Sequence, residues 1–203
     1  MLDTLDRKLR QMHAALDAIA TKDVSGIKPQ MESSATYVSM QVDFNANSEP
    51  IKLANASTLL IANIASLKDH LKAWCKLKGF PFNGDALINS NNAVALIHDL
   101  WNVDKHAELT SKPRSGSVPE LRDIRQALVV SAGAEADSGA FYSMDPRTGK
   151  VTSGASGSGS IKISLTAQVV DNEGNILGEL SSLCIEAIAA WEKEFVAVGV
   201  PLP

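Results

Sequence analysis

Two long amphipathic runs in the first half of the chain constrain its fold more than any other feature. In residues 51–78, apolar side chains recur at spacings of three and four, which is typical of a helix that buries one face. The members of this stripe are Leu60, Ile64, Leu67, Leu71 and Trp74. Gly79 follows as a helix stop. Residues 85–109 predict a second long helix, and the short connection 80–84 favours an antiparallel pair.

The two ends of the chain predict further helices. Residues 2–21 carry apolar side chains at helical spacing, and so do residues 180–198, where Ser181 or Ser182 is a candidate cap. The apolar stripe of the last helix includes Leu183, Ala187, Ala190, Trp191 and Phe195. The sequence therefore predicts about four helices, at least two of them long.

Alternating patterns predict a smaller β component. Residues 36–44 alternate between polar and apolar side chains, as a half-buried strand does. Residues 126–131 predict a short strand, and residues 160–171 alternate again. The segment 171–175 has the composition of a tight turn, and residues 176–177 are expected to begin a short return strand.

These elements together predict an α+β fold. We expect a single domain over residues 1–203, with a helical core formed by residues 1–110 and 180–198. A small antiparallel sheet is expected as an insertion at about 111–179. Within that insertion, the Gly/Ser-rich segment 153–160 is predicted to be flexible and poorly ordered. Near the start of the chain, residues 22–34 are predicted to be a loop.

Composition and charge exclude some classes of protein. The chain has 203 residues, of which 45% are hydrophobic, and its formal net charge is −4. Without a block of basic residues it does not offer the broad positive surface that grips duplex nucleic acid, although a local basic site stays open. The apolar runs are too short to span a bilayer and the first residues have no signal-peptide core, so we expect a cytoplasmic protein with no membrane partner. Cys75 and Cys184 are expected to be reduced and buried, with a disulfide between them as the alternative.

The segment Trp101–His106 is the most promising candidate site. His98, Asn102 and His106 recur at i, i+4 and i+8, so on a continuous helix they would line one face, with Lys105 at its border. His106 could then act as an acid or base, Asn102 could orient it or a phosphate oxygen, and Lys105 could stabilise an anion. The structural alternative is that Asn102 and His106 hydrogen-bond to neighbouring segments, while Lys105 is a solvated cation near the helix C-terminus.

A second polar pair, Asp69 and His70, lies on the preceding predicted helix. If the two long helices are antiparallel, their middles face each other, and this pair could approach Asn102 and His106. A carboxylate that orients an imidazole is a recurrent catalytic arrangement. The alternative is that both side chains are solvated or cross-link the two helices.

Four sequence pieces resemble an uncharacterised bacterial family with an Asn-x-Asp-Lys-His helix motif. They occur in the order Leu67–His70, Asn102–His106, Val170–Asn175 and Ala190–Glu192, and the resemblance covers about residues 59–195. That family in turn resembles the HEPN superfamily. Its members are helical bundles, often dimeric, and many are metal-independent ribonucleases of toxin–antitoxin or phage-defence systems.

The superfamily motif has an arginine, a polar residue, three variable positions and a histidine. On this chain the polar position falls on Asn102 and the histidine on His106, while Trp101 stands at the arginine position. Arginine would hold the scissile phosphate and stabilise its charge in the transition state, and tryptophan can do neither. The resemblance therefore supports a HEPN-like bundle better than it supports activity.

Two functional hypotheses follow. In the first, the chain is a HEPN-like, metal-independent ribonuclease in which His106, Asn102 and Lys105 act on RNA, assisted by Asp69 and His70. In the second, it is a non-catalytic interaction module that binds a protein or nucleotide partner. Both hypotheses include a homodimer, and neither includes a cofactor or a metal ion. In keeping with this, the glycines match neither a P-loop nor a dinucleotide fingerprint.

Overall fold

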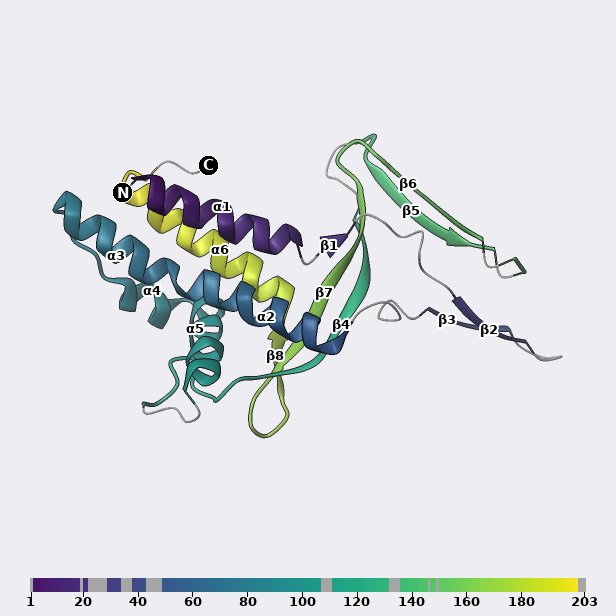
Figure 1. Cartoon of the computed structure of the whole chain (residues 1–203), viewed down its shortest axis with the longest axis horizontal. Helices are drawn as coiled ribbons and strands as arrows, with labels where there is room; N and C mark the ends of the chain where they lie inside the picture. Colours follow the sequence, from purple (N-terminus) through teal and green to yellow (C-terminus); the bar gives the residue numbers. More distant parts are fainter. Residues whose placement is uncertain are drawn as a thin grey trace. The chain divides into compact units, whose positions relative to one another are not determined.

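A computed structural model describes most of the chain (Figure 1). The described residues are 2–18, 20–21, 29–33, 38–42, 49–106, 111–131, 136–145, 147–148 and 150–200. The chain divides into two compact units. The first contains Met1–Ala18, Ile51–Ile124 and Thr166–Pro203, and the second contains Ile19–Pro50 and Arg125–Leu165. Whether residues 1–203 behave as a single domain stays a prediction.

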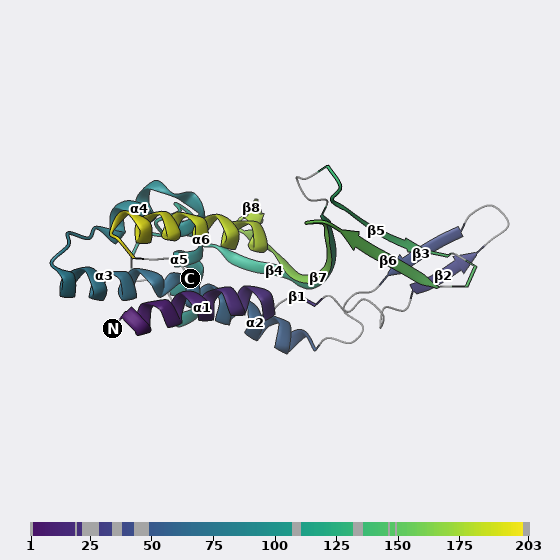
Figure 2. The same ribbon diagram turned by 90° about the horizontal axis from the view of Figure 1, so that it is seen from above.

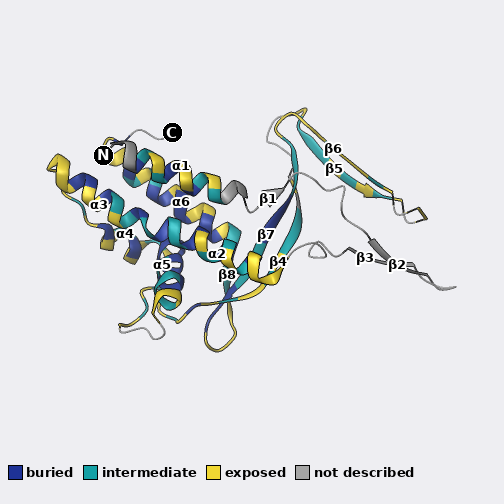
Figure 3. Ribbon diagram, in the orientation of Figure 1, coloured by how far each residue is buried: buried dark blue, intermediate teal, exposed yellow. Residues whose placement is uncertain are grey.

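Helices make up most of the first unit. They are α1 (Leu2–Ala18), α2 (Pro50–Ala65), α3 (Leu67–Lys78), α4 (Gly84–Ser90), α5 (Asn92–Lys105) and α6 (Leu180–Ala197). Helix α5 packs against α4 and α6, and α1 packs against α3. Their apolar faces form a core, drawn in dark blue in Figure 3, that includes Leu60, Leu71, Leu96, Trp191 and Phe195. Burial of these large side chains is the main favourable contribution to the folding of this unit.

Both of the predicted long helices are interrupted, so their predicted continuity is wrong. The first run is divided at Ser66 into α2 and α3, which still lie nearly in line in Figures 1 and 2. The second is divided at Asn91, whose backbone is extended, with φ −122° and ψ 114°. The side chain of Asn91 accepts a hydrogen bond from the backbone N–H of Val94 over 3.0 Å, so this residue caps α5. Asparagine is among the strongest N-caps, which is why the helix restarts there.

Strands occupy more of the chain than the sequence patterns predicted. They are β1 (Ala20–Thr21), β2 (Pro29–Ser33), β3 (Val38–Val42), β4 (Glu120–Ser131), β5 (Gly139–Met144), β6 (Val151–Ser156), β7 (Ser160–Val170) and β8 (Ile176–Glu179). The largest sheet has the order β1-β7-β4, and β8 also pairs with β7. Antiparallel hairpins are formed by β2 with β3 and by β5 with β6.

The predicted fold class, a HEPN-like bundle of about four helices with a small inserted sheet, is wrong. The described chain is a mixed α and β structure with three separate sheets, and α6 follows the strands. One reason is that part of the Gly/Ser-rich segment 153–160, predicted to be flexible, forms strand: residues 153–156 belong to β6, and Ser160 begins β7. Gly154 pairs with Phe141 across the β5–β6 hairpin, and a Cβ on Gly154 would lie 2.7 Å from the Phe141 ring. The ring thus covers the glycine backbone, which composition alone does not reveal.

Several local predictions are confirmed. The alternating segment 160–171 contains β7, and β8 is the expected return strand. Between them, the carboxylate of Asp171 accepts hydrogen bonds from the backbone N–H groups of Glu173 and Asn175, which closes the tight turn. The last predicted helix is α6, although Glu179 rather than Ser181 or Ser182 is its cap.

Other local predictions need correction or fall outside the description. Of the predicted loop at residues 22–34, residues 29–33 form β2. Within the predicted strand at residues 36–44, residues 38–42 form β3, and residues 36–37 and 43–44 lie outside the described residues.

Cys75 and Cys184 are both free and buried, so the disulfide alternative is wrong. Across the described helices, none has the length and apolar character needed to cross a membrane.

Candidate functional site

Helix α5 carries the candidate site because it combines a buried apolar run with polar side chains on its remaining surface. Residues 93–97 and Leu100 are buried, which fixes the helix in the core of the first unit. Asp99 is also buried, at 2% exposure. A buried carboxylate in such a position must be paired, so the polar contacts around α5 define the site.

His98 and Asn102 face each other on α5. Asn102 Nδ2 lies 3.0 Å from His98 Nδ1, one helical turn away, and both side chains are half-buried. Because an amide NH₂ group only donates, this arrangement makes Nδ1 the acceptor and leaves the proton of the neutral imidazole on Nε2. The amide of Asn102 is thus engaged with the histidine one turn before it rather than with His106.

The pKa of His98 is lowered. Burial is the largest cause, and the positive charges of Lys68 and Arg114 lower it further, while Asp99 and Asp69 act in the opposite direction. Both burial and nearby positive charge disfavour the imidazolium form. His98 is therefore predominantly neutral at pH 7.

The two cations near His98 share one carboxylate. Asp85 Oδ1 on α4 lies 2.8 Å from Lys68 Nζ on α3 and 2.8 Å from the guanidinium of Arg114. Arg114 also donates to Asn89 Oδ1 over 3.3 Å. The hydrogen bond from Lys68 is the main cause of a lowered pKa at Asp85, against a smaller opposing effect of burial. Asp85 therefore joins α3, α4 and the segment after α5, and it offsets the positive charge beside His98.

Asp99 holds the segment after α5 at Ser115, next to the contact between Asp85 and Arg114. Its Oδ2 accepts a hydrogen bond from the backbone N–H of Ser115 over 2.7 Å and another from Ser115 Oγ over 2.8 Å. Hydrogen bonds to an ionised acceptor are stronger than those between neutral groups. Asp99 and Asp85 together hold residues 114–115 against the helices.

Lys105 and His106 lie apart from these contacts. Helix α5 ends at Lys105 instead of continuing to 109, and His106 is its C-cap, with an extended backbone at φ −123° and ψ 125°. Both residues are exposed. Within the described ranges, neither side chain forms a hydrogen bond or ion pair, and residues 107–110 lie outside them. The predicted face of His98, Asn102 and His106 thus holds for its first two members only.

Asp69 and His70 are separated in a similar way. The pKa of His70 is lowered by burial and by Lys8 and Arg7 of α1, while Asp69 opposes the shift, so His70 lies near α1. Asp69 is exposed, and its charge acts on both His70 and His98. The five predicted catalytic residues are therefore distributed over three places: Asn102 beside His98, Lys105 and His106 at the end of α5, and the Asp69–His70 pair on α3.

Sequence reasoning missed most of the cluster around His98. The missed residues are Lys68, Asp85, Asp99, Arg114 and Ser115. One signal was present, because Asp99 lies only two residues after the apolar run 93–97 and directly before the apolar Leu100. No local pattern marks Arg114 and Ser115, which reach the helices from a Pro/Gly/Ser-rich segment.

In the described part of the chain, no group of three or more His, Cys, Asp or Glu side chains is placed to hold a metal ion. Comparison of the chain with family models, curated proteins and solved structures finds no match. The function is therefore inferred from the site itself.

Proposed function

We propose that this protein is a non-catalytic interaction module, and that the polar side chains around α5 fix its fold. The observation that carries the proposal is the separation of the groups that RNA cleavage would require. Asn102 is hydrogen-bonded to His98, while Lys105 and His106 are exposed at the other end of the polar face. An acid or base and a cation must both lie within hydrogen-bond reach of the same phosphate to act together.

The charges around His98 support the same proposal. Lys68 and Arg114 both contact Asp85, and Asp99 accepts from Ser115. Each cation of the cluster has an anionic partner, so the site attracts an anionic substrate less than two free cations would. Paired in this way, the side chains connect α3, α4, α5 and residues 114–115.

Assays of RNA cleavage in a metal chelator test the proposal. We expect no cleavage by the wild type, by His106→Ala or by Lys105→Ala, because Lys105 and His106 are exposed at the end of α5 and Asn102, which would orient the histidine or the phosphate, is hydrogen-bonded to His98 instead. His106→Ala should also unfold at the same temperature as the wild type, since the side chain is exposed and unpaired among described residues. Cleavage by the wild type that disappears in His106→Ala would overturn the proposal and restore the first hypothesis.

A metal-independent ribonuclease centred on His98 is the second candidate. Its support is the lowered pKa of His98 together with the proximity of Lys68 and Arg114, which could hold a phosphate if Asp85 released them. His98 would act as a base through Nε2, which requires Nδ1–H to donate to the amide oxygen of Asn102. In the same assay this candidate predicts cleavage that is lost in His98→Ala and retained in His106→Ala.

A homodimer is part of the proposal. Large apolar side chains are exposed on single helices, including Leu59 of α2 and Ile185 and Val196 of α6, and association of two copies would remove such surface from water. Sedimentation equilibrium should therefore give about twice the monomer mass of 21.6 kDa. A single species of monomer mass at micromolar concentration would contradict this prediction.

A cytoplasmic location also belongs to the proposal. Its support is that Cys75 and Cys184 are both buried and free, as is usual where thiols are kept reduced. Burial raises the pKa of the Cys184 thiol to about 12, with a smaller contribution from Glu179, so this cysteine is a packing residue rather than a nucleophile.

A further inference from the structure

A small cavity in the first unit lies between α2, α5 and β4. Its volume is about 150 Å³. The residues that line it are Thr58, Ile61, Leu100, Trp101, Val103, Asp104 and Leu121. On α5, the lining residues lie on a different part of the helix surface from His98 and Asn102, so the cavity is separate from the polar cluster. A cavity of this size holds a benzene-sized group in other proteins.

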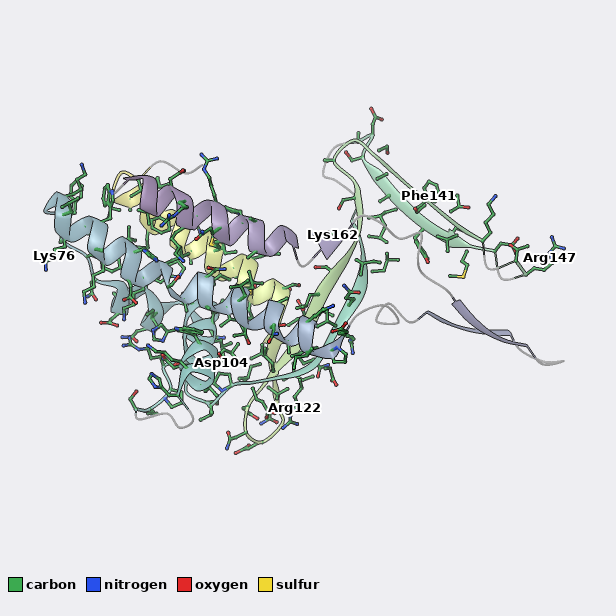
Figure 4. The ribbon with its side chains drawn as sticks, in the orientation of Figure 1. Lys76, Asp104, Arg122, Phe141, Arg147 and Lys162 are labelled. Carbon is green, nitrogen blue, oxygen red and sulfur yellow. The ribbon has the colours of Figure 1, made fainter. Side chains whose placement is uncertain are left out.

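Asp104 gives this mostly apolar cavity its charge. Ile61 and Leu100 are buried and Trp101 is half-buried, whereas Asp104 is exposed, so its position is at the mouth. Figure 4 labels Asp104 on α5. Throughout the described ranges, no hydrogen bond or ion pair involves its carboxylate. Trp101 and Asp104 are three residues apart on the helix, so they lie on the same side.

This combination of groups selects a particular ligand chemistry. The apolar walls favour an apolar body. The indole of Trp101 attracts a cation over its face, and the carboxylate of Asp104 attracts the same charge and repels anions. Thr58 is the other polar residue of the lining and can hydrogen-bond to an ammonium or guanidinium group.

We propose that this cavity binds an organic cation with a small apolar body, such as an amine or a guanidine. The cation can be a free molecule or the side chain of a lysine or arginine in a protein partner. In either case the apolar body enters between Ile61 and Trp101, and the charge remains beside Asp104.

Titrations followed by chemical shifts of backbone amides test this proposal on the full chain. Benzylamine, benzyl alcohol and benzoate present the same ring with a positive, a neutral and a negative substituent. We expect shifts at residues 100–104 with benzylamine, binding about tenfold weaker with benzyl alcohol, and none with benzoate. No shift at these residues with any probe, or equal affinity for amine and alcohol, would overturn the proposal.

Variants separate the contribution of the charge from that of the ring. Asp104→Asn should weaken benzylamine binding about five- to tenfold and leave benzyl alcohol unchanged, whereas Trp101→Leu should weaken both. Asp137→Asn is a matched control, because Asp137 is an exposed carboxylate in the second unit. An equal loss of benzylamine binding in Asp137→Asn and Asp104→Asn would contradict the assignment. Thermal unfolding of Trp101→Leu verifies that the variant is folded.

A second pair of probes distinguishes the source of the cation. Butylguanidine is a free molecule, and N-acetyl-arginine methylamide carries the same group on a peptide backbone. Tighter binding of the free guanidine supports a small-molecule ligand, and tighter binding of the blocked arginine supports a protein partner. Binding of neither, together with the absence of benzylamine binding, would overturn the cation site itself.

Discussion

Replacement of Asp99 by alanine is expected to lower the free energy of unfolding by about 3 kcal/mol. The carboxylate is 2% exposed and accepts hydrogen bonds from both the backbone N–H and the hydroxyl of Ser115. Hydrogen bonds to a charged group contribute about 1.5–3 kcal/mol, and a backbone N–H left without a partner adds to the loss. Residues 114–115 would then be held at Arg114 alone.

Thermal unfolding and urea titration measure this effect. For a chain of this length, a loss of about 3 kcal/mol corresponds to a fall in Tm of roughly 6–12 °C. Asp104→Ala is the matched control, because it removes an exposed carboxylate from the same helix and should change stability little. An unfolding free energy of Asp99→Ala equal to that of the wild type would show that the contact with Ser115 contributes nothing.

A double-mutant cycle with Ser115→Ala isolates the interaction. Ser115→Ala removes the hydroxyl but keeps the backbone N–H, so we expect a smaller loss of about 1 kcal/mol. In the Asp99→Ala background, the same change should cost less, because its main acceptor has gone. The hydroxyl also donates to the carbonyl oxygen of Ser117 over 3.0 Å, so some cost should remain.

Replacement of Glu179 by alanine is the second change with a large expected effect, a loss of about 2–3 kcal/mol. Glu179 ends β8 and caps α6, and its Oε2 accepts from the backbone N–H of Ser182 over 3.0 Å and from the hydroxyl of Ser181. Its Oε1 accepts from the hydroxyl of Thr166 on β7. One carboxylate thus joins β7 to the start of α6, and loss of a cap alone costs about 1 kcal/mol.

The effect of Glu179 should depend on pH. Burial is the largest single influence on its pKa and raises it, but the hydrogen bonds from Ser181, Thr166 and Ser182 together outweigh burial and lower the pKa. A folded-state pKa below the unfolded value means that the carboxylate stabilises the fold fully above the unfolded pKa of about 4.3. This stabilisation is lost as the pH falls through the lower, folded-state pKa.

Urea titrations at pH 7 and pH 3 measure this dependence. The difference in unfolding free energy between wild type and Glu179→Ala should be largest at pH 7 and smaller at pH 3. Glu179→Gln keeps one acceptor oxygen, so at pH 7 its unfolding free energy should lie between those of the wild type and Glu179→Ala. Because glutamine does not titrate, this position should then contribute little to the pH dependence of stability. A wild-type advantage that grows as the pH falls would contradict the lowered pKa.

The elements confirmed from the sequence have local causes. The apolar spacing of residues 180–198 predicts α6, and the alternation of residues 160–171 predicts β7, because side-chain period depends on the nearest neighbours along the chain. The turn at Asp171 is also local, since its carboxylate binds backbone groups two and four residues further on. Such features are readable without tertiary structure.

The errors arise where tertiary contacts override composition. Gly154 looks like part of a flexible linker, but Phe141 from the paired strand covers it. The first half of strand β4 is mostly polar, and its two apolar residues, Leu121 and Ile124, are three positions apart, so it lacks the alternation that marks a strand. The break at Asn91 is an exception, because its cause is local. An asparagine within a helical pattern is a candidate N-cap, so the sequence did contain a signal for the start of α5.

The candidate site shows the same division. Spacing on one helix predicts that Asn102 and His98 share a face, and the structure pairs them at 3.0 Å. The same spacing extends the face to His106 only if the helix continues, and α5 ends one residue earlier. Lys68 lies 17 positions before Asp85, and Arg114 lies 29 positions after it. Separations of this length are outside the range of helix or strand periodicity, so the sequence did not predict that the three side chains meet.

The sequence by itself determined the amphipathic helices, the β7–β8 turn and the polar character of α5, because each depends on side chains within about two helical turns of one another. The tertiary structure alone decided which polar groups are partners. Buried charges must be compensated by whichever opposite charge or donor the fold brings near. That requirement accounts for the hydrogen bond from Ser115 to Asp99 and for the position of Asp85 between two cations. Asp104 is exposed at the mouth of a cavity, and among the described residues its carboxylate has no partner.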